Sequence, residues 1–374
     1  MKKVFLGIFV LCKIIGVSAQ SQSFKDILIS AEQGSAIAQC YVASCYEHGK
    51  GVEQDDVEAL RWYRKAAEQK SPVAQFNIGL FYEYGRGGVP RNIKEAIMWF
   101  LKAAEQGFAP AQYQIGNLYW NGEGVAKNMS EAVQWWQKAA EQDYMSACYN
   151  LGYSYYNGIG VTQNYNEAVR WFRKAAEHGE YKAQYYLATC YYYGMGVTQN
   201  YAEAVRLFHK VAEAGEYMAQ YYLGECYHYG TGVVQNETVA AMWYLKAAEQ
   251  GYAEAQFNIG GYYSTGIGVM QNHNEATKWW RKAAEQGHSK AQDNMGVCYI
   301  TGQGVPQDLQ EAVRWWRKAA EQENANAQFK LGYCYENGIG VAQSRIDAII
   351  WYRKSAMQNC EEAKKHLNNL GVTW

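Results

Sequence analysis

The side chains best suited to metal or acid–base chemistry are dispersed along the chain. Its seven histidines are His48, His178, His209, His228, His273, His288 and His366. None of them forms the His-x-x-x-His spacing that places two ligands on one face of a helix, and no Cys-x-x-Cys pair occurs. We therefore predict neither a metal site nor a bound cofactor.

Motifs for nucleophilic or phosphate chemistry are also missing. The chain contains no Gly-x-Ser-x-Gly, no P-loop and no dinucleotide fingerprint. It also lacks the Ser-x-x-Lys and Lys-Thr-Gly motifs from which serine enzymes take a nucleophile and its base. Carboxylates recur, as at Glu167 and Glu203, but each follows an Asn by three residues, which is typical of helix capping. The prediction is a protein that is not an enzyme.

A repeat of 36 residues must position all of these side chains. Ala183, Leu187 and Tyr191 lie at helical intervals, and a loop from Gly194 to Val197 separates them from a second helical segment. Each copy therefore predicts two helices joined by a glycine-containing loop. One spacing is 37, because an extra glycine lengthens the loop that contains Gly88. The alanines that mark the copies are Ala38, Ala74, Ala111, Ala147, Ala183, Ala219, Ala255, Ala291 and Ala327.

Two recurring features of the copies predict how the helices pack and where the second helix begins. Glycine stands five residues after the alanine in seven copies, for instance at Gly152 and Gly224. Because glycine costs about 1 kcal/mol inside a helix, its recurrence predicts the close approach of another backbone. Asn followed three residues later by Glu, as in Asn200 and Glu203, predicts a capping box at the start of the second helix.

A single pair of helices cannot bury its apolar faces, whereas stacked pairs form one continuous core. We divide the chain into a leader at 1–19, a capping helix at 20–34, repeats at 35–359 and a capping helix at 360–374. The last range carries Lys364, Lys365 and His366, which we expect on a solvated face. The repeats are predicted at 35–70, 71–107, 108–143, 144–179, 180–215, 216–251, 252–287, 288–323 and 324–359.

Residues 35–359 resemble the Sel-1-like branch of the tetratricopeptide superfamily. They repeat the pattern A-x-A-Q-x-x-L-G-x-x-Y-x-x-G-x-G-V-x-x-N-x-x-E-A-x-x-W-x-x-K-A-A-E-Q-G, which residues 253–287 show well. The resemblance implies an all-α fold, a right-handed α-solenoid of antiparallel helix pairs. It also implies a concave side, lined by the first helices, that holds peptides or partner proteins. Members of this family are typically adaptors.

That geometry would place residues one before, and two, six, nine and ten after, each alanine on the groove. The binding candidates are Trp120, Tyr153, Tyr156, Tyr192, Tyr193, His228 and Tyr229. Aromatic side chains supply a large contact area at low entropic cost, which suits a binding surface. Tyr149, Tyr185 and Tyr221 face the same side, but they belong to the family pattern, so packing explains them equally well.

Five cysteines occupy one place in the repeat, seven residues after the alanine: Cys45, Cys190, Cys226, Cys298 and Cys334. Equivalent residues of adjacent repeats should lie about 9–10 Å apart, which is too far for a disulfide, so we predict buried thiols. A cysteine-rich branch of the family staples each repeat with two cysteines eight residues apart. Here Ala140 stands where Cys148 would need its partner. The pairing left to test is Cys334 with Cys360.

The N-terminus has the pattern of a secretory leader. Lys2 and Lys3 precede an apolar run from Val4 to Cys12, and a small-residue site ends at Ala19. We predict cleavage after Ala19 and a secreted or periplasmic protein. An uncleaved anchor is the alternative, although the run is far shorter than the roughly 20 residues that a spanning helix needs. No later segment of the sequence has the length and hydrophobicity of a membrane span.

These observations favour an exported scaffold that binds a protein or peptide in the groove. A formal net charge of −1 and the absence of long runs of like charge argue against nucleic acid as a partner. Two alternatives stay open. One is an enzyme acting on cell-wall material or β-lactams, and the other is a carbohydrate-binding or cell-wall-binding module with Trp120 as its best residue.

Overall fold

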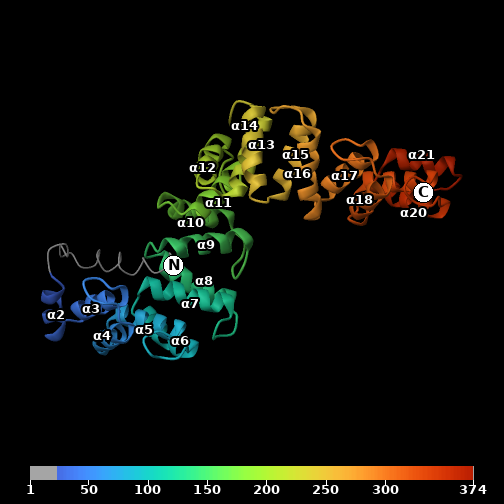
Figure 1. Cartoon of the computed structure of the whole chain (residues 1–374). Coiled ribbons are helices and arrows are strands. Elements are labelled where there is room, and N and C mark those ends of the chain that lie inside the picture. Colours follow the sequence, from blue (N-terminus) through green and yellow to red (C-terminus); the bar gives the residue numbers. More distant parts are fainter. Residues whose placement is uncertain (1–22, 374) are drawn as a thin grey trace. The chain divides into compact units, whose positions relative to one another are not determined.

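The computed structural model describes residues 23–373, and these residues form helices α2 to α21 without any strand (Figure 1). The all-α fold class is therefore confirmed. The predicted leader and its cleavage site lie outside the described residues. In chain order the helices are α2 (Phe24–Glu32), α3 (Ala36–His48), α4 (Asp56–Glu68), α5 (Pro72–Tyr84), α6 (Ile93–Glu105), α7 (Ala109–Asn121), α8 (Met129–Ala140), α9 (Met145–Asn157), α10 (Tyr165–Glu177), α11 (Tyr181–Tyr193), α12 (Tyr201–Glu213), α13 (Tyr217–Tyr229), α14 (Glu237–Glu249), α15 (Ala253–Thr265), α16 (His273–Glu285), α17 (Ser289–Thr301), α18 (Leu309–Glu321), α19 (Ala325–Asn337), α20 (Arg345–Met357) and α21 (Glu361–Asn369).

The chain divides into two compact units. The first comprises residues 23–183 and 195–197 of the described chain, and the second comprises residues 184–194 and 198–373. Within the first unit each helix from α2 to α10 packs against the next, and within the second unit the same holds from α12 to α21. Helices α3 to α20 alternate as the first and second helices of nine pairs, which gives an α-solenoid with an additional helix at each end.

The capping of the second helices differs from the predicted box. The Asn164 side chain accepts hydrogen bonds from the backbone N–H groups of Asn166 and Glu167, as expected of an N-cap. The N–H of Asn164, however, donates to the carbonyl oxygen of Tyr155 at 2.9 Å, so it is not available to Glu167. Among residues 23–373, the complete box is present only at Ser23 and its partner at the start of α2. The carboxylates at the third helical position instead bind the basic residue three positions later, as in the pairs Glu58/Arg61, Glu167/Arg170, Glu203/Arg206, Glu275/Lys278 and Glu311/Arg314.

The seven glycines that stand five residues after the alanine each face an aromatic ring first, whereas the sequence suggested a neighbouring backbone. A Cβ atom on Gly152 would lie 2.7 Å from the ring of Phe172, which comes from the second helix of the same pair. Close backbone approach occurs in the loops. A Cβ on Gly160, whose φ is +74°, would collide with the carbonyl oxygen of Met129 at the start of α8. The helical glycine therefore allows the two helices of one pair to pack closely. The loop glycine allows the loop to pack against the preceding pair.

A relay of glutamine side chains also links the helices. The Gln112 amide donates to the carbonyl oxygen of Ala104 in the preceding pair at 3.2 Å, and its own oxygen accepts from Gln142 at 2.8 Å. The fourth pair, α9 and α10, has Cys148 and His178 at the two glutamine positions and lacks the relay, and the fifth pair has Ala214 at the second position and lacks the glutamine-to-glutamine bond. The glutamine-to-glutamine bond recurs in Gln39/Gln69, Gln75/Gln106, Gln220/Gln250, Gln256/Gln286, Gln292/Gln322 and Gln328/Gln358.

The five cysteines of the repeat are buried thiols, as predicted. Burial raises the pKa of Cys190 and Cys226 to about 12, with a small additional contribution from Glu225 at Cys226. Cys334 is a free thiol and so is Cys360, whose sulfur lies 3.6 Å from an oxygen of Glu362.

The last helix, α21, is less solvated than the sequence suggested. The Lys364 side chain is only 13% exposed, and the His366 ring is turned inward, where its Nδ1 lies 2.9 Å from Oε2 of Glu336. Lys365 is exposed as expected. Within residues 23–373, no helix combines the length and the apolar character that crossing a bilayer would demand.

Candidate binding site

Three of the predicted binding residues belong to the first unit and lie half-buried against neighbouring rings. The ring centroid of Trp120 on α7 is 5.1 Å from that of Trp136. On α9, Tyr156 packs against Tyr165 at 5.4 Å, and Tyr153 lies 6.3 Å from Tyr149. These side chains contribute to packing as well as to the surface.

Tyr192 and Tyr193 of α11 lie together in the second unit. Their ring centroids are 4.9 Å apart, and Tyr222 of α13 lies 5.8 Å from Tyr192. Tyr222 is itself stacked on Phe208 of α12, with centroids 5.1 Å apart and ring planes 1° apart. The Tyr193 side chain is 52% exposed, so an exposed ring rests on a rigid aromatic support.

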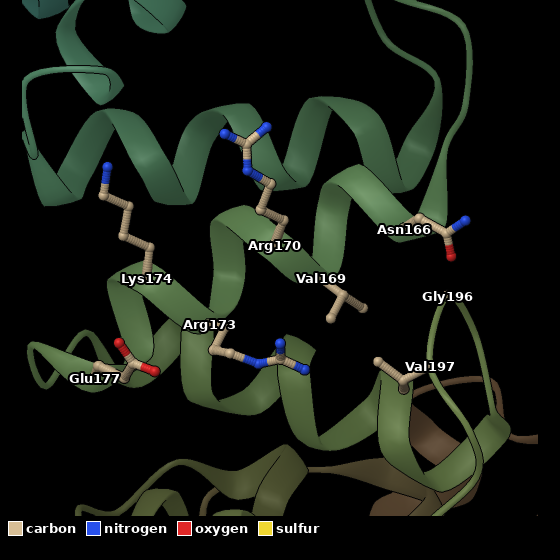
Figure 2. A pocket seen from close by; sticks show the side chains of 8 residues that line it. All are labelled: Asn166, Val169, Arg170, Arg173, Lys174, Glu177, Gly196 and Val197. Atoms are coloured by element: carbon tan, nitrogen blue, oxygen red, sulfur yellow. The ribbon is translucent and has the colours of Figure 1, made fainter.

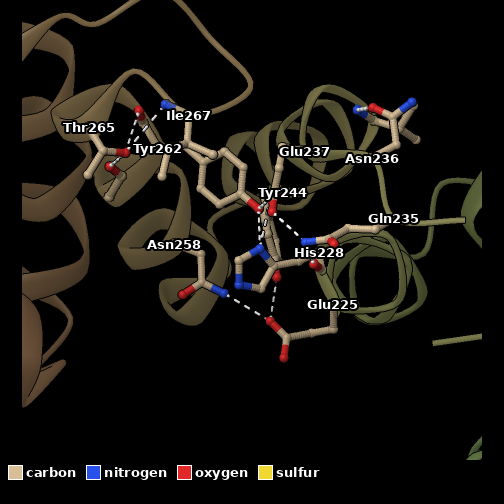
Figure 3. Close-up of polar contacts among 12 residues, drawn as sticks. Glu225, His228, Gln235, Asn236, Glu237, Tyr244, Asn258, Tyr262, Thr265 and Ile267 are labelled. Atoms are coloured by element: carbon tan, nitrogen blue, oxygen red, sulfur yellow. Dashed lines mark hydrogen bonds and ion pairs between the residues drawn. The ribbon is translucent and has the colours of Figure 1, made fainter. Parts of the chain in front are cut away.

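His228 and Tyr229 lie at the end of α13, and their ring centroids are 4.5 Å apart. Tyr229 is 66% exposed. His228 is half-buried, and its Nδ1 lies 2.9 Å from Oε2 of Glu237 and 2.8 Å from the hydroxyl oxygen of Tyr262 (Figure 3). The Tyr262 hydroxyl also donates to Glu237 at 2.5 Å. His228 is therefore fixed by residues from α14 and α15.

Glu225 occupies the middle of α13 and is half-buried. Its Oε1 accepts a short hydrogen bond from the hydroxyl of Tyr244 on α14 and a bond of 3.2 Å from the amide of Asn258 on α15 (Figure 3). The carboxylate is thus held in place by two neutral donors.

The tyrosines around Glu225 have raised pKa values. Burial raises the pKa of Tyr192 to about 12, and the nearby groups of Cys226, Tyr193 and Glu225 add to this shift. Burial and then the charge of Glu225 raise the pKa of Tyr221 well above its ordinary value. For Tyr262, burial is followed by the hydrogen bond to Glu237 as a cause of the raised pKa. These phenols are neutral at physiological pH and can donate hydrogen bonds.

We call this surface the α13 face and define it by Tyr192, Tyr193, Tyr221, Tyr222, Glu225, His228 and Tyr229, all of which belong to the second unit. Sequence reasoning identified Tyr192, Tyr193, His228 and Tyr229 but missed Glu225, because only aromatic residues and histidine were selected from the projected positions. It also missed Tyr222, which lies outside those positions, and the supporting residues Glu237, Tyr244 and Tyr262. Tyr262 could have been noticed because it stands where five other copies have cysteine.

A separate hollow of about 300 Å³ lies in the first unit beside α10. Figure 2 shows that three basic side chains of α10 contribute to its lining. Arg170 is paired with Glu167 at 3.3 Å, and Lys174 is paired with Asp143 at 2.5 Å. Two of these cations already have carboxylate partners, so this hollow is a weaker candidate. The complete lining is Asn166, Val169, Arg170, Arg173, Lys174, Glu177, Gly196 and Val197.

Metal-ligating side chains do not gather anywhere in residues 23–373: no group of three or more His, Cys, Asp or Glu residues is placed to hold a metal ion. His228 and His366 each contact one carboxylate and a tyrosine hydroxyl, and His288 contacts the Glu254 carboxylate and the backbone N–H of Ala291. These contacts form hydrogen-bonded clusters.

The helix pairs, the loop glycines and the glutamine relay together define a two-helix repeat protein of the tetratricopeptide-like class. The chain belongs to the Sel1 repeat family. The family profile matches residues 36–71, 72–108, 109–144, 146–180, 182–216, 218–252, 253–288, 289–324 and 325–360.

Two solved structures of high similarity carry the same repeats. A protective antigen of uropathogenic Escherichia coli that displays an SLR fold is 38% identical, with 93% of this chain and 75% of that chain covered and a TM-score of 0.85. A Sel1 repeat protein from Oxalobacter formigenes is 34% identical, with 84% of this chain and 94% of that chain covered and a TM-score of 0.63.

Similarity to curated proteins covers short stretches. HRD3A of Arabidopsis thaliana, a component of an ERAD-associated E3 ubiquitin-protein ligase, is 36% identical over 58 residues, which is 16% of this chain and 9% of that protein. Chitin synthase regulatory factor 3 of Schizosaccharomyces pombe is 38% identical over 80 residues, 21% of this chain and 9% of that protein. The match thus spans about a tenth of each of these relatives.

Proposed function

We propose that this protein is an exported, non-enzymatic scaffold that binds a protein or peptide on the α13 face. The observation that carries this proposal is the pair of exposed rings, Tyr193 and Tyr229, on a face whose other aromatic side chains are fixed by packing. Exposed aromatic residues on a rigid support are the usual anchors of protein interfaces, because they bury much area and lose little entropy.

The family membership supports the same interpretation. Stacked repeats present an extended surface, and residues that differ between copies can specify a partner without disturbing the shared core. HRD3A is named as a component of a larger ligase, and chitin synthase regulatory factor 3 is named as a regulator of an enzyme. Both names are consistent with proteins that act through other proteins.

The test is to capture the partner in the native compartment by cross-linking and mass spectrometry, and then to repeat the capture with variants. Tyr193→Ala/Tyr229→Ala should lose at least about tenfold in affinity for the captured protein, since two anchors of an interface are removed. Tyr84→Ala is the matched control, because Tyr84 is 63% exposed at the end of α5 in the first unit. Circular dichroism should show equal helicity for all variants, and equal capture by the double variant would refute the proposed site.

Export is a separate part of the proposal and has its own measurement. The pattern that ends at Ala19 supports removal of a leader, so the mature protein should begin at Gln20. N-terminal sequencing of the protein recovered from the periplasm or medium tests this. Recovery of an unprocessed chain from the cytoplasm alone would contradict export without affecting the binding face.

A further inference from the structure

Glu225 gives the α13 face a charge that the exposed tyrosines alone would not supply. We propose that this face recognises a basic segment of the partner, with an arginine or lysine side chain bound against the Glu225 carboxylate among the surrounding tyrosines. The inference rests on the proposed function and specifies the chemistry of the partner.

The surface around Glu225 carries negative charge, and the residues of the second unit that surround it on the first helices include no lysine or arginine. Residues 184–193 of α11 and all of α13 and α15 contain no Lys or Arg, while α13 and α15 contain Glu225 and Glu254. Glu254 is 52% exposed and contacts the imidazole of His288 at 3.0 Å. A basic ligand would therefore meet complementary charge and no cation from residues 184–193, α13 or α15.

The hydrogen bonds of Glu225 leave it able to accept a further donor. Both bonds that it receives from described residues, from Tyr244 and Asn258, end on Oε1. An ionised carboxylate can accept at both oxygens, so Oε2 can receive a guanidinium or ammonium N–H. The two protein donors hold the group in position before the ligand arrives.

The same unit contains an internal example of this interaction. Asp293 of α17 is paired with Lys330 of α19, whose Nζ lies 2.7 Å and 2.8 Å from the two carboxylate oxygens. Lys330 stands three residues after Ala327, as Asn258 stands three residues after Ala255. The first helices α17 and α19 include the lysine that binds the carboxylate, whereas α13 and α15 offer only the Asn258 amide. We expect the ligand to supply the cation there.

The tyrosines suit a cation as well as an apolar contact. The electron-rich faces of aromatic rings attract ammonium and guanidinium groups, more strongly where water is partly excluded. Tyr192 and Tyr222 are half-buried with ring centroids 5.8 Å apart, and Tyr193 and Tyr229 are exposed. A basic side chain with a long aliphatic stem could pack along these rings while its charge reaches Glu225.

The experiment uses the full exported chain and a fluorescein-labelled peptide of alternating glycine and arginine. A matched peptide has citrulline in place of arginine, which keeps nearly the same shape and removes the charge. Anisotropy at low salt should show binding of the arginine peptide and at least about tenfold weaker binding of the citrulline peptide, because a charge-assisted hydrogen bond is lost.

Two variants test the role of Glu225. Glu225→Gln removes the charge and keeps an acceptor for Tyr244 and Asn258, and Asn258→Lys supplies an internal cation in the manner of Lys330. Each should weaken the arginine peptide by about tenfold. Asp293→Asn is the matched control, because it removes the same charge from a carboxylate that already has a partner, and it should change affinity by less than about twofold.

Several outcomes would overturn the inference. These are no binding of the arginine peptide, equal binding of the citrulline peptide, equal loss with Asp293→Asn, or no loss with either test variant. If Glu225→Gln fails to fold, as judged by circular dichroism, Asn258→Lys decides the question. If Tyr193→Ala/Tyr229→Ala loses the native partner and Glu225→Gln keeps it, the basic-segment inference fails and the proposed binding function stands.

Discussion

At two places in the second unit, a carboxylate on one first helix contacts a side chain on the following first helix: from α13 to α15, and from α17 to α19. The two places differ in the side chain that makes the contact. Glu225 on α13 receives an amide from Asn258, whereas Asp293 on α17 receives the ammonium of Lys330. The supporting structure is the same in both regions, since Gly224 lies over Tyr244 and Gly296 lies over Trp316. The carboxylates stand at different places in the repeat, six residues after Ala219 for Glu225 and two residues after Ala291 for Asp293. Both are met by the residue three positions after the next alanine, which is an amide in one region and a lysine in the other.

The residue seven positions after the alanine separates the two regions further. In α15 it is Tyr262, which extends back to His228 and Glu237 of the preceding pair. In α19 it is Cys334, a small buried thiol. Tyr262 is itself buried, so the difference shows that this core position can hold either a small thiol or a tyrosine whose hydroxyl fixes His228 of the preceding pair.

The largest expected effect concerns what the two regions share. Gly224→Val and Gly296→Val would drive a Cβ atom into the Tyr244 ring and the Trp316 ring, respectively. Each should lower the free energy of unfolding by about 3 kcal/mol, because a packed ring must move. Urea titration followed by circular dichroism measures this loss.

Gly261 provides the control for these variants. It lies in α15, and a Cβ added there would meet nothing within 4 Å. Gly261→Ala should therefore raise the unfolding free energy by about 1 kcal/mol through helix propensity alone. If Gly296→Val were as stable as Gly261→Ala, the proposed ring contact would be wrong.

A smaller effect is expected from exchanging the residues that distinguish the regions. Lys330→Asn should cost about 1–2 kcal/mol, because it leaves Asp293, whose side chain is 12% exposed, without its cation. Asn258→Lys should be neutral or stabilising by up to about 1 kcal/mol, since it forms a pair with Glu225. Thermal unfolding at low and high salt measures both changes. If Lys330→Asn were as stable as the parent chain, the Asp293–Lys330 ion pair would contribute nothing to stability, and the proposed difference between the two regions would be wrong.

The smallest effect is the pH dependence that Glu237 contributes in the α13 region. Burial alone would raise the pKa of Glu237, but hydrogen bonds from His228 and Tyr262 outweigh burial and lower it below the ordinary 4.5. Its contribution is therefore complete above pH 4.5 and is lost as the pH falls through the lower folded value. We expect a loss below about 1 kcal/mol, because the group is partly exposed.

Glu237→Gln removes the titrating group and tests this expectation. The variant should show a flatter decline of unfolding free energy at acid pH than the parent chain. Leu309 occupies the corresponding first position of α18, so the α17 region has no equivalent carboxylate there. An identical acid profile for Glu237→Gln and the parent would show that these hydrogen bonds contribute nothing to stability.

Local signals in the sequence were sufficient for the helix pairs. Gly158, with φ of 69°, ends α9 as its position after the helical segment predicted, because such an end depends on its own backbone. The capping box failed at Asn164 because the carbonyl of Tyr155, from another helix, occupies the N–H that the box needs. The small residue at Gly152 was predicted correctly, but periodicity could not tell whether a ring or a backbone lay opposite.

The binding face required information that a single repeat does not contain. Tyr193 and Tyr229 could be chosen because they differ between copies and lie at projected positions. The contacts of Glu237 with His228 and Tyr262 join residues from three helices in two repeats, so they depend on how far one pair is shifted along the next. That register becomes visible only when the helices are packed.

The missing relay in the fourth pair has a consequence for how the first unit opens. Besides the backbone N–H of Asp143, the carbonyl of Ala140 faces the Cys148 sulfur at 3.7 Å and the Lys174 ammonium at 3.2 Å. In seven of the nine pairs an amide held by a second amide occurs instead. Each repeat of such a protein contacts only its neighbouring repeats. Local unfolding therefore begins at the interface between repeats that is least stable. Amide protons of α9 should therefore exchange with deuterium sooner than those of α7, and this joint would also be the first that a protease could reach.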